Sequence, residues 1–225
     1  MYRALFYKEW LKIKQAFLFV TLLGLGVIVY LYFDIEQTNT FNDSNAFWNV
    51  ISGKGYIYYD LFRYIPLVAG LALALAQFVP EIINKKLKLT LHLPLKENKI
   101  LLVMQSFTLG LLTLLSLVWL LLMIIISSIY FPAEIVNSMI LTSLPWFLAG
   151  LITYTSVSAL VLEPVWGRRI VHGIVGLAIL WLLTSGVRYS AFSGILPLVS
   201  IAVLFSFSFI LWSGRRFKMG VSKND

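Results

Sequence analysis

The chain has 225 residues, of which 60% are hydrophobic and only 12% are charged, and its mean hydropathy is +0.87. Soluble domains carry about 25% charged residues, so this composition excludes an ordinary soluble protein. The net charge is +8, and the absence of cysteine excludes disulfides and thiolate metal sites.

Residues 1–15 predict an amphipathic helix that lies at the membrane interface. Apolar residues recur there at steps of three and four, while basic residues and Glu9 occupy the other positions. The apolar positions are Tyr2, Leu5, Phe6, Trp10, Ile13 and Phe17. A helix with a tryptophan on its apolar face and a basic opposite face lies among lipid headgroups. The basic residues are also explained as an orientation signal alone, and the pattern leaves this alternative open.

Six long apolar runs follow, and each is long enough to cross a bilayer. A helix needs roughly 20 residues to cross the hydrocarbon core, which is about 30 Å thick. The runs are 16–33, 60–79, 100–130, 138–161, 170–187 and 194–212. Because they occupy nearly all of the sequence, we expect residues 1–225 to form one all-α integral membrane domain that ends in a tail, 213–225.

The positions of the basic residues predict how these spans are oriented. If the N-terminus is cytoplasmic, all but three of the 18 lysines and arginines fall in cytoplasmic segments. The exceptions are Lys54, Arg63 and Arg188. Basic residues in short loops orient membrane proteins, so both termini are expected in the cytoplasm. Topology and contact with anionic lipids then explain the positive charge, and no nucleic-acid partner is required.

Asp60 and Arg63 stand three residues apart at the predicted outer end of the second span. This spacing places them on one face of a helix, where they can form an ion pair. A local ion pair is one interpretation, and a latch at an outer gate is the other.

Small residues recur four apart on the same span, and they allow helices to approach closely in lipid. They are Gly70, Ala74, Ala72 and Ala76. Close packing within one chain and a seam between two chains both explain this pattern.

The connection 80–99 is the most polar of the predicted cytoplasmic segments. It carries Glu81, several lysines and His92 among leucines at helical spacing, and Pro94 is expected to end any helix there. One interpretation is a short helix parallel to the membrane, with one side open to a partner. The other is a basic loop that only orients the protein.

The order EIINKKLKLTLHLPLKENKILLVMQ in this region resembles the first cytoplasmic loop of ABC-2-type ABC exporter permeases. The matching positions are Glu81, Thr90, Leu93, Pro94, Lys96, Lys99 and 100–102, whereas Lys86 and Gln105 depart from the family pattern. The resemblance implies a coupling helix within 80–99 that docks in a groove of the ATPase subunit. The residues to which it assigns this contact are Glu81, Lys85, Lys86, Thr90, Leu91 and Pro94. The six spans, the cytoplasmic termini and the amphipathic N-terminal helix also resemble the family.

The connection between the fourth and fifth spans is a candidate for a second contact with the ATPase. Its residues for this role are Glu163, Trp166, Arg168 and Arg169. Tryptophan and arginine also anchor helices at the membrane interface, so simple anchoring is the alternative.

The chain lacks the motifs that bind nucleotides or perform catalysis. It has no G-x-x-x-x-G-K-[ST] phosphate-binding loop, no nucleophile elbow and no set of acids or histidines spaced for a site. We therefore expect no catalytic, cofactor-binding or metal-binding residue. No charged residue stands at the centre of an apolar run, which disfavours an ion-coupled carrier.

The resemblance then implies a permease subunit of an ABC exporter in a bacterial cytoplasmic (inner) membrane. ATP and Mg²⁺ would bind to a separate ATPase subunit, expected in two copies. A second permease chain, identical or different, would complete the pathway. The alternatives are a non-catalytic membrane scaffold or immunity protein and, less favoured by the residues, an intramembrane enzyme. Nothing in the sequence identifies a cargo.

Overall fold

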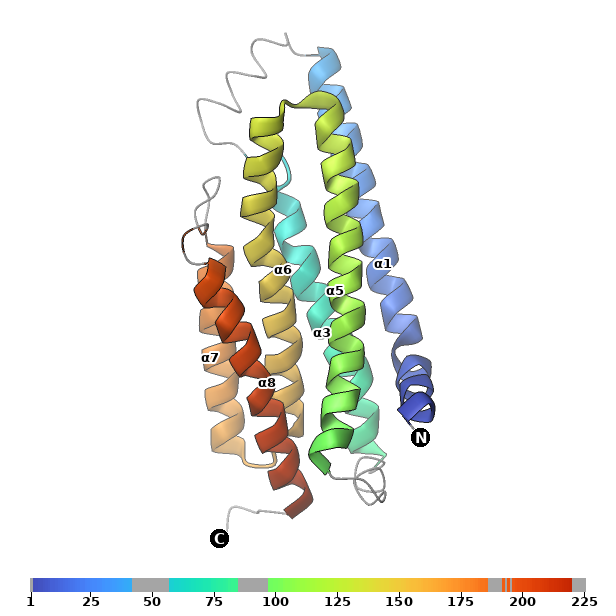
Figure 1. Ribbon diagram of the computed structural model, residues 1–225, viewed down its shortest axis with the longest axis vertical. Coiled ribbons are helices and arrows are strands. Elements are labelled where there is room, and N and C mark those ends of the chain that lie inside the picture. Colours follow the sequence, from blue (N-terminus) through green and yellow to red (C-terminus); the bar gives the residue numbers. More distant parts are fainter. Residues whose placement is uncertain are drawn as a thin grey trace.

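The computed structural model describes residues 2–41, 57–84, 97–185, 192, 194 and 196–219. In this part of the chain the elements are all helical, and successive long helices run in opposite directions along one bundle (Figure 1). The long helices are α1 (Tyr2–Phe41), α3 (Tyr64–Ile83), α5 (Glu97–Tyr130), α6 (Ala133–Leu162), α7 (Trp166–Thr184) and α8 (Leu196–Met219), and the short helix η1 (Asp60–Arg63) precedes α3.

Each of the long helices has the length and hydropathy needed to cross a membrane. The described residues contain six candidate spans, and the shortest of them have 19 residues. At 1.5 Å per residue, such a helix extends about 28 Å, close to the thickness of the hydrocarbon core. The expected all-α class and the six spans are therefore confirmed by length and composition.

The helix ends differ in detail from the apolar runs. α1 continues without interruption past residue 15, where the sequence pattern places the change from interfacial helix to span. α3 continues through Pro80 to Ile83, so Glu81 lies within a helix. α6 begins well before the run 138–161, and Glu134 favours this start because an acidic residue stabilises a helix N-terminus.

α3 and α6 form the centre of the bundle, and two glycines allow their backbones to approach closely. A Cβ atom on Gly70 would lie 2.2 Å from the carbonyl oxygen of Gly150, and one on Gly150 would lie 2.7 Å from the carbonyl oxygen of Pro66. Ala74, one turn further along α3, is also fully buried. Gly70 and Ala74 therefore pack within the chain, which is the first of the two interpretations of their spacing.

The other helices are arranged around this pair. α1 packs against α5 where the buried Trp119 ring lies on Gly24, since a Cβ atom on Gly24 would lie 2.3 Å from that ring. α7 and α8 both contact α6. Only 11% of the residues in the span of α7 are buried, so most of this helix is exposed in the single chain.

Candidate functional site

The starts of α1, α5 and α7 and the ends of α3, α6 and α8 lie at one end of the bundle (Figure 1). Three glutamates are buried there: Glu9 near the start of α1, Glu81 near the end of α3 and Glu163 directly after α6. Each carboxylate is held by basic side chains from a terminal helix, α1 or α8. We call this region, defined by Lys8, Glu81, Glu163 and Arg216, the charged end.

Glu81 ties α3 to α1. Its Oε1 atom lies 3.0 Å from the Nζ atom of Lys8 and 2.7 Å from that of Lys12. The three residues, together with Pro80, line an open pocket of about 380 Å³ between the two helices. Only 1% of Glu81 is exposed, and a carboxylate buried to this extent needs a positively charged partner. The ion pairs therefore attach the N-terminal helix to the helix that leads into residues 85–96.

Glu9 is fully buried, although the sequence pattern places it on the polar face of an interfacial helix. α1 is turned so that Leu5, Glu9 and Ile13, which stand four residues apart, all face the bundle. Glu9 is accommodated because the Nζ atom of Lys12 lies 2.5 Å from its carboxylate and the amide of Gln77 donates to it at 2.8 Å. The prediction that Glu9 lies on an exposed polar face is therefore wrong. Its two partners offset the cost of burying the carboxylate.

Gln77 joins four helices through one amide group. Its Nε2 atom donates to Glu9 Oε2 on α1 at 2.8 Å and to the carbonyl oxygen of Met104 on α5 at 2.9 Å. Its Oε1 atom accepts hydrogen bonds from Thr108 on α5 at 2.8 Å and from Tyr154 on α6 at 2.6 Å. An amide has two donor and two acceptor positions, so the bonding capacity of Gln77 is fully used. This closed network stabilises the bundle and leaves no amide position for a substrate.

Glu163 ties the α6–α7 connection to α8. Arg216 Nε donates to Glu163 Oε1 at 3.1 Å, and Ser213 Oγ donates to Oε2 at 2.8 Å. His172 on α7 places its Nε2 atom 3.8 Å from the same Oε2 atom. Burial raises the pKa of the Glu163 carboxyl, but the hydrogen bonds from Arg216 and Ser213 outweigh burial and hold this pKa below its ordinary value.

The other residues of the predicted second ATPase contact surround Glu163. Trp166 and Arg168 are exposed, whereas Arg169 is partly buried. The guanidinium of Arg169 lies 5.0 Å from the Trp166 ring centre and donates to the carbonyl oxygen of Glu163 at 2.8 Å. Trp166 and Arg168 are thus accessible to lipid or to a partner, while Glu163 and Arg169 stabilise the connection.

Most of the predicted coupling residues lie outside the described residues; these are Lys85, Lys86, Thr90, Leu91 and Pro94. Their role stays a prediction. α3 ends at Ile83 and α5 begins at Glu97, so the segment that contains them starts and finishes at the charged end (Figure 1).

Asp60 and Arg63 lie at the opposite end of the bundle and form the expected ion pair, with 3.2 Å between Arg63 Nη1 and Asp60 Oδ1. Arg63 also donates to the Tyr64 hydroxyl at 2.8 Å and to the carbonyl oxygen of Thr184 at 3.4 Å. The second contact joins η1 to the end of α7. The pairing is confirmed, and a role in gating stays a prediction.

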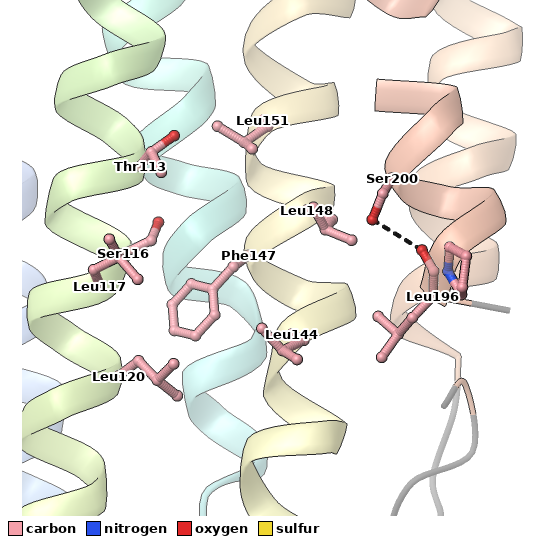
Figure 2. A pocket seen from close by; sticks show the side chains of 11 residues that line it. Thr113, Ser116, Leu117, Leu120, Leu144, Phe147, Leu148, Leu151, Leu196 and Ser200 are labelled. Atoms are coloured by element: carbon pink, nitrogen blue, oxygen red, sulfur yellow. Dashed lines mark hydrogen bonds between the residues drawn. The ribbon is translucent and has the colours of Figure 1, made fainter. Parts of the chain in front are cut away.

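A pocket of about 420 Å³ lies between α5, α6 and α8. In Figure 2, side chains of α5 and α8 form two opposite walls, and those of α6 lie between them. The lining residues are Thr113, Ser116, Leu117, Leu120, Leu144, Phe147, Leu148, Leu151, Leu196, Pro197 and Ser200. None of them is charged, which distinguishes this pocket from the one beside Glu81.

The partners within these networks are what the sequence reasoning missed. Gln77 is visible as a polar residue in an apolar run, and this signal could have marked it as a bonded core residue. Its partner Glu9 is 68 positions away, and Arg216 is 53 positions from Glu163. Such distant pairs have no local periodicity, so only the packing of the helices shows them.

Within the described part of the chain, no group of three or more histidine or acidic side chains is arranged to hold a metal ion. Comparisons with protein-family models, with curated proteins and with solved structures found no match to this chain. The function proposed below therefore rests on the geometry of the bundle and on the residues of the sequence.

Proposed function

We propose that the chain is the permease subunit of an ABC exporter in a bacterial cytoplasmic membrane, with its charged end in the cytoplasm. The observation that carries this proposal is the position of Glu81. This residue opens the segment that resembles a coupling loop, and its ion pairs with Lys8 and Lys12 attach that segment to α1. A displacement of residues 85–96 by an ATPase would therefore act on α1 and α3 together.

The second connection at the charged end supports the same mechanism. Glu163 is bonded to Arg216, so the α6–α7 connection and α8 also form one mechanical unit. Exposed Trp166 and Arg168 extend this unit to the surface, where a partner can contact it. Closure of two ATP-bound partner subunits would push on both connections, and a second permease chain would complete the pathway.

The experiment that tests this proposal is purification of the tagged chain from its native cell in a mild detergent, followed by mass spectrometry of co-eluting proteins. We expect a protein with a phosphate-binding loop in a defined stoichiometry. The double substitution K85E/K86E, which changes the predicted docking segment, should abolish its recovery because it reverses the charge offered to the partner. K54E, which reverses a lysine on the predicted outer side, is the matched control.

Glu81 itself is a poor choice for this substitution because its loss would break the tie between α1 and α3 inside the chain. Recovery of an intact chain without any ATPase, from a preparation in which known complexes of the same membrane survive, would contradict the exporter proposal. That result would favour a membrane scaffold. If K54E loses the ATPase to the same extent, then the net charge of the protein, and not the docking segment, controls co-purification of the ATPase.

A further inference from the structure

We propose that the 420 Å³ pocket between α5, α6 and α8 binds one hydrocarbon chain of an amphiphile, and that the exporter's cargo is such an amphiphile. The binding of a hydrocarbon chain concerns this protein alone. The assignment of the amphiphile as cargo rests on the function proposed above.

The pocket opens sideways from the bundle. Phe147 and Ser116 are buried and form its floor, whereas Leu117, Pro197 and Ser200 are exposed and form its rim. All of these residues belong to the membrane-spanning stretches of α5, α6 and α8. A molecule therefore enters the pocket from the lipid phase, without crossing the bundle or passing the charged end.

The chemistry of the lining selects an uncharged chain. Leucines dominate it, and no lining residue carries a charge. The hydroxyl of Ser116 donates to the carbonyl oxygen of Leu112 at 2.8 Å, and that of Ser200 donates to the carbonyl oxygen of Leu196 at 2.9 Å. These two donors are already used within their own helices. A charged group would lose its hydration here without gaining an oppositely charged partner, whereas a hydrocarbon chain loses nothing.

The size of the pocket suits a single long chain. A protein cavity of about 150 Å³ lined by leucine, isoleucine and phenylalanine binds benzene, which has six carbons. In proportion, the 420 Å³ found here has room for about 17 carbons. This length is that of a common fatty acyl chain, and the volume falls within the range of ligand pockets, about 300–1,000 Å³.

The test uses the purified full chain and a diazirine-bearing palmitic acid as the probe, with the sites of photolabelling identified by mass spectrometry. We expect labels on α5, α6 and α8 around the pocket, and competition by unlabelled palmitic acid. S200W fills the pocket mouth, while S208W adds the same ring to an exposed serine elsewhere on α8. Displacing two buried methylenes lowers binding about tenfold, so S200W should lose about tenfold in labelling and S208W should not.

A second matched pair protects the test from a folding failure of S200W. Leu117 and Leu121 are 55% and 58% exposed on α5, and only Leu117 lines the pocket. L117W should reduce labelling in a chain that melts at the same temperature as L121W. Equal labelling in both members of each pair, or labels spread along the exposed face of α7, would overturn the pocket as a specific site.

The source of the bound hydrocarbon chain is identified by analysing the lipids that co-purify with the protein from its native membrane. An amphiphile enriched over the bulk membrane, and lost from S200W but not from S208W, supports a cargo. Phospholipids in bulk proportions overturn the cargo assignment and identify the occupant as ordinary bilayer lipid. The ATPase should still co-purify with the S200W variant, so loss of the amphiphile and loss of the ATPase are separate results. Absence of the ATPase from every variant contradicts the exporter but leaves the palmitic acid measurement valid.

Discussion

Glu163 shows how a buried charge at the charged end depends on its neighbours. It has no exposed surface, and among the described residues its charged or titratable contacts are Arg216 on α8, His172 on α7 and the nearby Arg169. Loss of one member of a fully buried ion pair costs about 3–5 kcal/mol. Arg216 is 18% exposed and partly solvated, so we expect a smaller cost, about 2 kcal/mol, for Glu163→Gln.

The same residue predicts a pH dependence. Because the pKa of Glu163 is lower in the folded chain than in the unfolded chain, the unfolded state binds more protons near that pKa. Its stabilising effect is complete above the ordinary carboxyl pKa, about 4.3, and declines as the pH falls below that value. Thermal melting in detergent between pH 7 and pH 3.5 should show a smaller acid-induced decrease in Tm for E163Q than for the wild type. An unchanged slope in E163Q would contradict this account.

Two buried glutamines provide a test of what hydrogen bonding does in this bundle. Gln77 has every amide position occupied, whereas neither amide atom of Gln105 has a hydrogen-bond partner in the described part of the chain. Gln77→Leu removes a hydrogen-bond partner from Glu9, Thr108 and Tyr154, and each buried polar group left unpaired costs about 1–3 kcal/mol. Gln105→Leu removes no such partner and eliminates a buried unpaired amide.

We therefore expect opposite results from these two substitutions of the same chemistry. Melting of the purified chains should show a marked decrease in Tm for Q77L and an unchanged or higher Tm for Q105L. Equal decreases in both would mean that side-chain shape, and not hydrogen bonding, controls stability at these positions.

At the scale of helices, the approach of α3 to α6 is set by Gly70 and Gly150. A methyl group on Gly70 would meet the carbonyl oxygen of Gly150 at 2.2 Å, and this oxygen belongs to the backbone of a helix and cannot move aside alone. Gly70→Ala must therefore separate the two central helices. Overpacking of this kind costs about 1–3 kcal/mol.

Gly110 on α5 is the control for this prediction, since a Cβ atom added there meets no atom within 4 Å. Gly110→Ala should be neutral or stabilising, because alanine favours a helix by about 1 kcal/mol over glycine. G70A should lower the melting temperature and increase proteolysis of the purified chain relative to G110A. Similar behaviour of the two variants would show that α3 and α6 do not approach as closely as described.

For the whole molecule, sequence and structure agree on what depends on composition along the chain. Long apolar runs predicted six helices correctly, because crossing a bilayer requires a minimum length of apolar helix. The sequence predicts less well which side of α1 faces the bundle. Glu9 looks like a surface residue from its neighbours, yet it is buried because Gln77, far away in sequence, supplies a partner. The rotation of a helix about its axis follows from such long-range contacts, which local periodicity does not contain.

The orientation of the bundle in the membrane connects the fold with the proposed function. The charged end carries the start of α1, the end of α8, the α6–α7 connection, and the ends of α3 and α5 that flank residues 85–96 (Figure 1). ATP is cytoplasmic, so the exporter proposal requires this end to face the cytoplasm, as the distribution of lysine and arginine predicts. Because the chain has no cysteine, single cysteines report their own accessibility without background.

We expect K54C to react with a membrane-impermeant maleimide in intact cells and K86C to react only after the membrane is opened. S222C, in the C-terminal tail, should behave as K86C does if the tail shares the cytoplasmic side. The reverse pattern would place residues 85–96 outside the cell, out of reach of any ATP-driven partner. The exporter proposal would then fail, whereas the pocket between α5, α6 and α8 would stay open to lipid in either orientation.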